Sequence, residues 1–226
     1  MKTILAFLAI FMCSNLAHGQ KKEKIINLPG YEKDRFHFGF SFTGLRSDLY
    51  IDMGQNQVNY TVTSSPQTGF GMNIISDLNL HKNLSVRFCP GISFIAYQTY
   101  LSQLQTNYSV IAQQIAATTL DFPFEIKVRT NRFGNLGLFA ASGMNYAYFI
   151  QEKQSIQSPG SAYFTKDDIS LRNGLGAEYY FPYFKMSVDL KYALGIKNIY
   201  NTSSGNGAGV NAMKSRAFLV TLCFEG

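Results

Sequence analysis

Apolar and polar residues alternate along eight stretches of this chain. Within each stretch every second residue is apolar, which is the period of a β-strand whose two faces meet different surroundings. The stretches are residues 36–43, 70–80, 84–97, 120–129, 135–148, 171–181, 184–195 and 216–224. The pattern predicts an all-β protein.

The connections between these stretches alternate between long and short. Residues 81–83, 130–134 and 182–183 form short links, and the other four connections are each about 15 to 30 residues long, more than a compact domain usually contains. Outer-membrane barrels have tight turns at one end, long loops at the other, an even number of strands and both termini on the turn side. The sequence therefore predicts an eight-stranded antiparallel transmembrane up-and-down β-barrel.

The two faces of the predicted strands differ in size and charge. In the fourth stretch Phe122, Phe124 and Ile126 share one face, and Asp121 and Glu125 share the other. A soluble barrel such as a lipocalin also alternates, but with its apolar face inside a narrow lumen that fits tapering small and large residues. The apolar face here is bulky along nearly every strand, so we assign it to lipid and expect the lumen to be a polar core without a pore.

This assignment defines a set of lipid-facing residues and a set of inward charged residues. The lipid belt is predicted to include Phe88, Phe124, Ile126, Val188, Leu190 and Val220. The predicted inward charged set is Asp77, Arg87, Asp121, Glu125, Lys127, Arg129, Arg172, Glu178, Lys185, Asp189 and Lys191.

The short links also predict the register of two strand pairs. If Leu80 pairs with Leu84, then Asp77 lies opposite Arg87 and the two form an inward ion pair. If Phe181 pairs with Phe184, the outward pairs are Tyr179 with Met186, Ala177 with Val188, and Leu175 with Leu190.

The first residues have the pattern of an export signal. Lys2 precedes an apolar run over residues 4–16, and Ala17-His18-Gly19 has the small residues of a cleavage site. A transmembrane helix is the competing interpretation, but the run is shorter than the roughly 20 residues needed to span a bilayer. The predicted organisation is a signal peptide over 1–19, a periplasmic N-terminal tail over 20–35 and the transmembrane barrel over 36–226, with the protein in the outer membrane and both termini periplasmic.

Composition adds little to this prediction but excludes one class of partner. The mean hydropathy of −0.04 fits strands in which every second residue faces a polar interior. The net charge of +6 is modest, and the basic residues 21–24 lack the interleaved arginine and aromatic residues of a nucleic-acid surface. We expect a solvated tail and no nucleic-acid partner.

No arrangement of residues predicts catalysis, a cofactor or a metal site. His37 is expected to point inward at a strand start and His81 to lie in a tight turn, and neither has a partner nucleophile or metal-ligand spacing. The chain contains no G-x-S-x-G elbow, and residues 205–209 are glycine-rich but lack the strand–turn–helix context of a nucleotide loop. We therefore predict a protein that is not an enzyme, with no catalytic, cofactor or metal residues and no binding site that the sequence identifies.

Two cysteines and two prolines within the strands raise separate questions. Cys89 and Cys223 could form one disulfide, but the predicted strand order puts them three strands apart, so we expect two free, buried thiols. Pro90 and Pro123 each remove a hydrogen bond from a ladder without a free edge, so bulges or kinks are expected at both.

Several segments taken in order resemble the PorT family of outer-membrane barrels. They are Asn27-Leu28-Pro29-Gly30 leading to residues 36–40, then 86–94, 181–191, and 219–224 after Lys214-Ser215-Arg216. The resemblance covers nearly the whole chain after the predicted signal, with gaps at the four long loops. It implies a role in the type IX secretion system, which exports proteins with a C-terminal sorting domain across the outer membrane of Bacteroidetes-type bacteria.

Two functions remain open from the sequence. The first is a non-enzymatic accessory of type IX secretion, with the outer-membrane lipid bilayer and other type IX components as partners. The second is a general small barrel of the OmpX or OmpA-like type, which acts as an adhesin or envelope anchor through its loops. The PorT family has no established catalytic residues to assign to positions of this chain.

Overall fold

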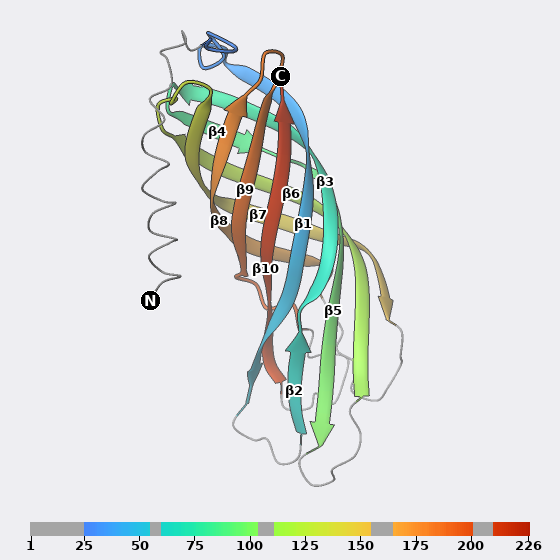
Figure 1. Ribbon diagram of the computed structural model, residues 1–226. Coiled ribbons are helices and arrows are strands. Elements are labelled where there is room, and N and C mark those ends of the chain that lie inside the picture. The colour runs from blue at the N-terminus through green and yellow to red at the C-terminus, as the bar shows by residue number, and fades with distance from the viewer. Residues whose placement is uncertain (1–24, 55–59, 104–110, 155–164, 201–209) are drawn as a thin grey trace, which may run out of the picture.

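The computed structural model describes residues 25–54, 60–103, 111–154, 165–200 and 210–226, so the predicted signal peptide over 1–19 lies outside the described residues. Ten strands in these ranges form one antiparallel sheet that closes on itself (Figure 1). They are β1 (Phe36–Met53), β2 (Tyr60–Ser65), β3 (Gln67–His81), β4 (Leu84–Phe88), β5 (Gly91–Gln103), β6 (Ile111–Arg129), β7 (Leu136–Gln154), β8 (Asp167–Tyr180), β9 (Lys185–Gly195) and β10 (Val210–Glu225).

The ten strands occupy eight positions around the ring. β2 and β3 are separated only by Pro66 and both pair with β5, while β4 and β5 are two halves of one crossing. The order is β1, β3, β4 with β5, β6, β7, β8, β9, β10 and back to β1. The predicted eight-stranded antiparallel up-and-down barrel is confirmed. We call the end with the three short links the short-turn end and the opposite end the long-loop end.

The strands extend further toward the long-loop end than predicted. β1 continues to Met53 and remains paired with β10 to that point, and only residues 54–59 separate it from β2. The prediction of connections of about 15 to 30 residues is therefore wrong for the first three, because much of each is strand, whereas residues 196–209 still separate β9 from β10. Beyond the apolar belt the outward face becomes polar, as at Arg46 and Asp48 of β1, so the apolar alternation stops while the hydrogen-bond ladder continues.

The predicted register is confirmed across two of the short links. Asp77 lies opposite Arg87 between β3 and β4. All three outward pairs predicted between β8 and β9 are present, namely Tyr179 with Met186, Ala177 with Val188, and Leu175 with Leu190. The predicted pairing of Leu80 with Leu84 is wrong, because a register shift between Asn79 and His81 pairs His81 with Leu84 instead.

Pro90 and Pro123 share one interruption of the ladder. β4 ends at Phe88 and β5 begins at Gly91, as the proline between them predicts. Pro123 lies opposite this gap and accepts a hydrogen bond from Cys89 N at 3.1 Å. The bulge predicted at Pro123 is absent from the β6–β7 ladder, which runs in register through Pro123 and Asn145 and shifts only between Thr118 and Thr119.

The assignment of the two faces is also confirmed. All six predicted belt residues are at least 40% exposed on the outside of the ring, whereas ten of the eleven predicted inward charges are buried and Arg172 is 14% exposed. A soluble barrel with an apolar interior is excluded by this arrangement. No helix in the described part of the chain is long and apolar enough to span a membrane.

The lumen is apolar only near the long-loop end. Inward side chains from β1, β5, β6, β10 and the segment after β9 form a buried cluster there. Its members are Leu49, Tyr97, Ile115, Ile199, Val210 and Met213. The lumen was predicted to be a polar core. This cluster departs from that prediction because the strands continue past the belt and carry inward apolar side chains there.

Leu190 tests the lipid-facing assignment. We expect Leu190→Lys to lower the free energy of unfolding from phospholipid vesicles by about 2 to 4 kcal/mol, the cost of a lysine near the bilayer midplane. Tyr183→Lys, in the exposed link between β8 and β9, should cost less than about 1 kcal/mol. If urea titrations gave the same loss of unfolding free energy for both substitutions, the assignment of the apolar face to lipid would be wrong.

Candidate functional site

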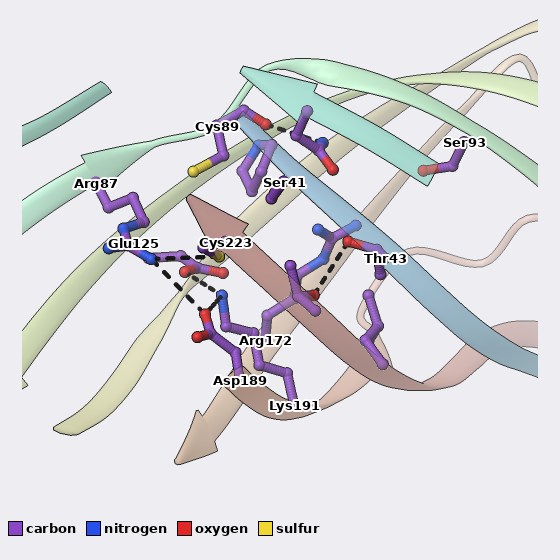
Figure 2. Close-up of a pocket in the computed structure, with 14 residues that line it drawn as sticks. Ser41, Thr43, Arg87, Cys89, Ser93, Glu125, Arg172, Asp189, Lys191 and Cys223 are labelled. Atoms are coloured by element: carbon purple, nitrogen blue, oxygen red, sulfur yellow. Dashed lines mark hydrogen bonds and ion pairs between the residues drawn. The ribbon is translucent and has the colours of Figure 1, made fainter. Parts of the chain in front are cut away.

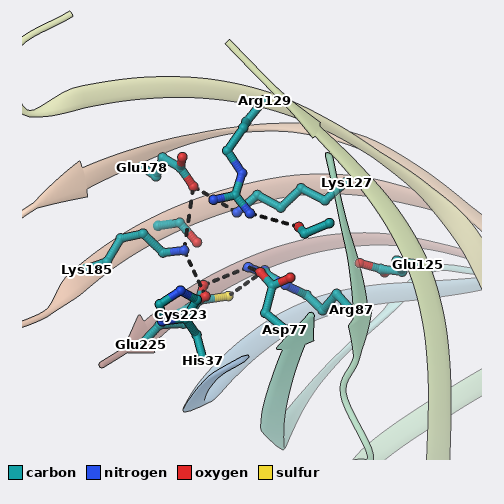
Figure 3. A network of polar contacts seen from close by, with 12 residues as sticks. His37, Asp77, Arg87, Glu125, Lys127, Arg129, Glu178, Lys185, Cys223 and Glu225 are labelled. Atoms are coloured by element: carbon teal, nitrogen blue, oxygen red, sulfur yellow. Dashed lines mark hydrogen bonds and ion pairs between the residues drawn. The ribbon is translucent and has the colours of Figure 1, made fainter. Parts of the chain in front are cut away.

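A network of ion pairs fills the short-turn half of the lumen, with Arg87 at its centre (Figure 3). The Arg87 guanidinium lies 2.9 Å from an Asp77 oxygen, 2.7 Å from a Glu225 oxygen and 3.7 Å from an Asp189 oxygen. These carboxylates belong to β3, β10 and β9, so one side chain of β4 connects strands on different sides of the ring. A buried cation needs such partners because removing it from water is costly.

Lys185 joins this cluster to a second one. Its Nζ lies 2.9 Å from Glu225 and 3.8 Å from Glu178. Glu178 in turn accepts hydrogen bonds from Lys127 Nζ and from the Tyr180 hydroxyl, both at 2.8 Å. The Arg87 cluster and the Glu178 cluster are therefore connected through Glu225 and Lys185, and together they form one continuous network.

Further pairs extend the network toward the long-loop end. Lys191 Nζ lies 2.6 Å from Glu125 and 3.2 Å from Asp189. Arg172 lies 3.6 Å from Asp121, which also accepts a hydrogen bond from Asn145 at 3.1 Å. Apart from the apolar cluster near the long-loop end, the described lumen is therefore a packed polar core, as predicted.

Sequence reasoning placed all eleven inward charges correctly but missed two buried carboxylates. Glu225 continues the inward alternation of Thr221 and Cys223 on β10, so the signal was present in the sequence. Asp168 lies where β8 extends beyond its predicted start, and its Oδ2 accepts a hydrogen bond from Ser215 at 2.5 Å. With these two, the described lumen carries seven acidic and six basic residues.

Side chains of the described residues line two small cavities in the lumen. The one nearer the short-turn end has a volume of about 30 Å³ and is lined by both cysteines together with Arg87 (Figure 2). The other, of about 60 Å³, lies next to Arg172, Asn145 and Asp168. Both hold at most a few water molecules, so neither gives a solute a passage.

The cysteines are free, as predicted. Cys223 is buried and accepts a hydrogen bond from Arg87 Nη1 at 3.9 Å, whereas Cys89 is only partly buried. Three steps of the ladder separate their strands, and neighbouring strands lie about 4.8 Å apart. That separation exceeds the reach of a disulfide.

Residues 25–35 form a cap on the short-turn end of the barrel. Leu28 adopts a left-handed φ of 48° and Gly30 a φ of 143°, a conformation that favours glycine. Hydrogen bonds from Tyr31 N to Leu28 O at 3.2 Å and from Lys33 N to Gly30 O at 2.7 Å close the two turns. The Asn27-Leu28-Pro29-Gly30 segment thus turns the chain so that Tyr31 enters the lumen.

Tyr31 is the residue of this cap that fills the end of the lumen. Its ring stacks on His37 at 3.7 Å between centroids, meets Tyr180 edge-on at 5.6 Å, and lies 4.6 Å from Lys185 Nζ. Burial raises the pKa of the Tyr31 hydroxyl well above its usual range, so the side chain is neutral. The hydroxyl has no hydrogen-bond partner within the described residues, so packing holds Tyr31 in place.

Polar contacts fasten the rest of the cap to the barrel rim. Arg132 pairs with Glu32, donates to Asn27 O at 2.9 Å and lies over the Tyr180 ring at 3.3 Å. The Asn27 side chain donates to Tyr180 O at 2.9 Å. Residues 25–35 of the predicted N-terminal tail therefore pack against the barrel, and residues 21–24, for which a solvated tail is predicted, lie outside the described part of the chain.

His37 lies where the sequence placed it, since it points into the lumen and its Nε2 lies 2.8 Å from Tyr31 O. His81 was expected in the tight turn but is the exposed last residue of β3. No group of three or more His, Cys, Asp or Glu residues among the described positions could hold a metal ion. His37 stacks on Tyr31 and so supports the cap from beneath.

A closed strand ring with a bulky apolar exterior and an ion-paired interior defines a transmembrane β-barrel of the outer-membrane class. Residues 20–201 match the family described as outer membrane protein beta-barrel domain, and the chain belongs to that family. The family places the protein in the outer membrane, in contact with its lipid bilayer. No protein of curated function matches the sequence.

The solved structure of OprG supports the fold, and the chain is also similar to two other solved outer-membrane proteins. OprG of Pseudomonas aeruginosa is 18% identical with a TM-score of 0.51, and the match covers 84% of this chain and 93% of OprG. Ail, the attachment invasion locus protein of Yersinia pestis, is 12% identical with a TM-score of 0.39, over 85% of this chain and 100% of Ail. The outer membrane protease OmpT of Escherichia coli is 11% identical with a TM-score of 0.43, over 85% and 96%.

The Arg87 cluster should be strongly coupled. Arg87→Met leaves three buried carboxylates without their shared cation and should cost about 3 to 5 kcal/mol of unfolding free energy. Asp77→Asn should cost less, because Arg87 keeps two partners, and the double variant should cost less than the sum. The half-exposed Arg216–Asp48 pair at 3.1 Å is the control and should show a coupling of about 1 kcal/mol or less. Additive effects of the Asp77 and Arg87 substitutions would contradict the network.

Tyr31 should hold the cap on the barrel. We expect Tyr31→Ala to increase tryptic cleavage after Lys33 and Arg35 in the folded protein, because the aromatic stack is lost. Tyr31→Phe is the matched control and should remain protected, because the hydroxyl makes no hydrogen bond. The measurement is the rate of cleavage by mass spectrometry, and indistinguishable rates for the two variants would show that the stack does not anchor the cap.

Proposed function

We propose that this protein is a non-enzymatic accessory of type IX secretion that acts by contact with other machinery and conducts no cargo itself. The observation that carries the proposal is the obstructed lumen. Ion-paired side chains fill it, Tyr31 closes the short-turn end, and the apolar cluster around Leu49 and Met213 closes the long-loop end. A barrel with a filled lumen has only its outer surfaces available for contact with other proteins.

The resemblance to the PorT family supports the secretion role, and the resembling segments build the features just described. Residues 27–30 form the turns of the cap. Residues 86–94 include Arg87 and the break at Pro90, and residues 181–191 supply Lys185, Asp189 and Lys191 to the network. The likeness therefore includes the residues that obstruct the lumen and is not confined to lipid-facing positions.

The short-turn end is our choice for the contact surface. Ile25 and Ile26 of the cap are exposed, and so are Phe133 and Tyr183 in two of the short links. Asn135 Nδ2 donates to Ile25 O at 3.0 Å, which ties the cap to the link that contains Phe133. With the signal peptide over 1–19 and both termini periplasmic, as we propose, this apolar end would meet periplasmic or inner-leaflet parts of the machinery.

The alternative function is that of an adhesin or envelope anchor of the OmpX or OmpA-like type. The extension of β1, β5, β6 and β7 beyond the lipid belt favours this alternative, because an adhesin needs a rigid projecting structure at the end opposite the short turns. The two functions use opposite ends of the barrel, so they can be separated by experiment.

A deletion strain tests the secretion role directly. We expect sorting-domain cargo to accumulate in the periplasm of the deletion strain while the remaining envelope proteins stay at normal levels. The wild-type gene should restore surface display, and a variant with Ile25→Glu and Ile26→Glu should fold but restore display poorly, since it alters only the exposed end of the cap.

Each result distinguishes the two functions. Normal surface display in the deletion strain, together with loss of cell attachment, would reject the secretion role and favour the adhesin. Full restoration by the double glutamate variant would leave secretion in place but move the contact surface away from the cap.

A further inference from the structure

A polar pair lies on the lipid-facing side of the barrel, apart from the lumen and the cap. Ser142 of β7 and Asn173 of β8 are opposite each other in the ladder and both are exposed on the outer face. The Ser142 hydroxyl donates to Asn173 Oδ1 at 2.7 Å. Their neighbours on that face include Ile126 and Leu175, which belong to the apolar surface.

The pair lies near the middle of the apolar belt. Asn173 is six residues from Tyr179 at the short-turn end of β8 and six from Asp167 at the other end. With a rise of about 3.4 Å per residue and a tilt of about 40°, each distance along the membrane normal is about 15 Å. The apolar band of such barrels is about 25 Å tall, so Asn173 faces hydrocarbon.

The hydrogen bond to Ser142 leaves most of the amide unsatisfied. An asparagine side chain has two N–H donors and a carbonyl oxygen with two lone pairs. In the described part of the chain, only the bond from Ser142 uses any of these groups, and Tyr192, the neighbour of Asn173 on β9, makes no hydrogen bond to it. Lipid tails offer no partner, so such a side chain is unfavourable unless a protein surface covers it.

The side chains around the pair have complementary sizes. Leu175 is 68% exposed. The short side chains of Ala140, Ala177 and Asn173 flank it, whereas Leu190 lies opposite it on β9. Small residues allow two membrane-embedded surfaces to approach closely. We call Ala140, Ser142, Asn173, Leu175 and Ala177 the Asn173 patch.

We propose that a second copy of this chain covers the Asn173 patch in the membrane. Two copies inserted in the same direction are related by a two-fold axis along the membrane normal, so contacts join residues at the same depth and only a residue beside the axis meets its own counterpart. The proposal places Asn173 beside that axis. An amide is self-complementary in that arrangement. Each Asn173 Nδ2 donates to the Oδ1 of its counterpart, and that oxygen still has a lone pair free after accepting the Ser142 hydroxyl.

The sizes of the neighbouring side chains fit the same arrangement. Beside a two-fold axis at Asn173, Leu175 of each copy meets residues other than itself on the partner, and the short side chain of the partner's Ala140 leaves room for it. Any other occupant would need its own amide at the same depth and its own complementary shape. The proposal goes beyond the role in secretion and does not depend on it.

The test is self-association in lipid. Purified full chain labelled with donor or acceptor dyes is reconstituted into phosphatidylcholine vesicles, and energy transfer is followed as the ratio of lipid to protein is raised. Wild type should show transfer that falls only at high dilution. Asn173→Leu should weaken association about tenfold, since two intramembrane hydrogen bonds are lost, while Asn173→Gln, which keeps the amide, should retain most of it.

Matched cysteine variants locate the interface. In a Cys89→Ser, Cys223→Ser background, Leu175→Cys should cross-link to a second copy with a short bismaleimide several times more than Ile74→Cys, whose exposure of 67% is the same but which lies on β3. Circular dichroism confirms that each variant folds. Monomeric wild type at every dilution, or unchanged association of Asn173→Leu, would overturn the proposal and indicate a different membrane partner or none.

Discussion

The rest of the structure depends on the pairing of charges inside the closed ring. Neither lipid nor bulk water can solvate the seven acids and six bases of the lumen, so each needs a charged or hydrogen-bonding partner there. Arg87 meets carboxylates from β3, β9 and β10, and Lys185 meets carboxylates from β8 and β10. A slip of one residue in any of these strands would turn its charges toward lipid. Charge pairing therefore fixes the register of strands that never touch through their backbones.

Much of this arrangement could be predicted because a strand repeats every two residues. That period alone separates Arg87 and Glu125 from Phe88 and Phe124, and a three-residue link suffices to set Asp77 opposite Arg87. The strand ends could not be predicted, because the outward face becomes polar past the belt and the alternation disappears while pairing continues. Glu225 obeys the alternation of β10 but lies one residue beyond the predicted strand, so its place at the centre of the network was missed.

The cap could not be predicted from the alternation of apolar and polar residues, for a different reason. Residues 25–35 have no periodicity, and their fold depends on Leu28 and Gly30 in unusual backbone conformations and on contacts with Asn135 and Tyr180 far along the chain. The lipid-facing Asn173 was visible in the sequence as a polar residue on the apolar face, yet its significance depends on its depth, which only the strand ends define. With the lumen closed at both ends, the surfaces left for function are the cap, the long-loop end and the outer wall.

Glu225 has a consequence for how the barrel is assembled. It supplies the shortest ion pair of both Arg87 and Lys185, and it arrives only when β10 docks between β1 and β9. An open sheet that lacks β10 leaves Arg87 and Lys185 without their nearest carboxylate, and incompletely paired cations oppose its transfer into hydrocarbon. Completion of these ion pairs and closure of the ring are then a single event, so a barrel without its final strand is held back from the bilayer.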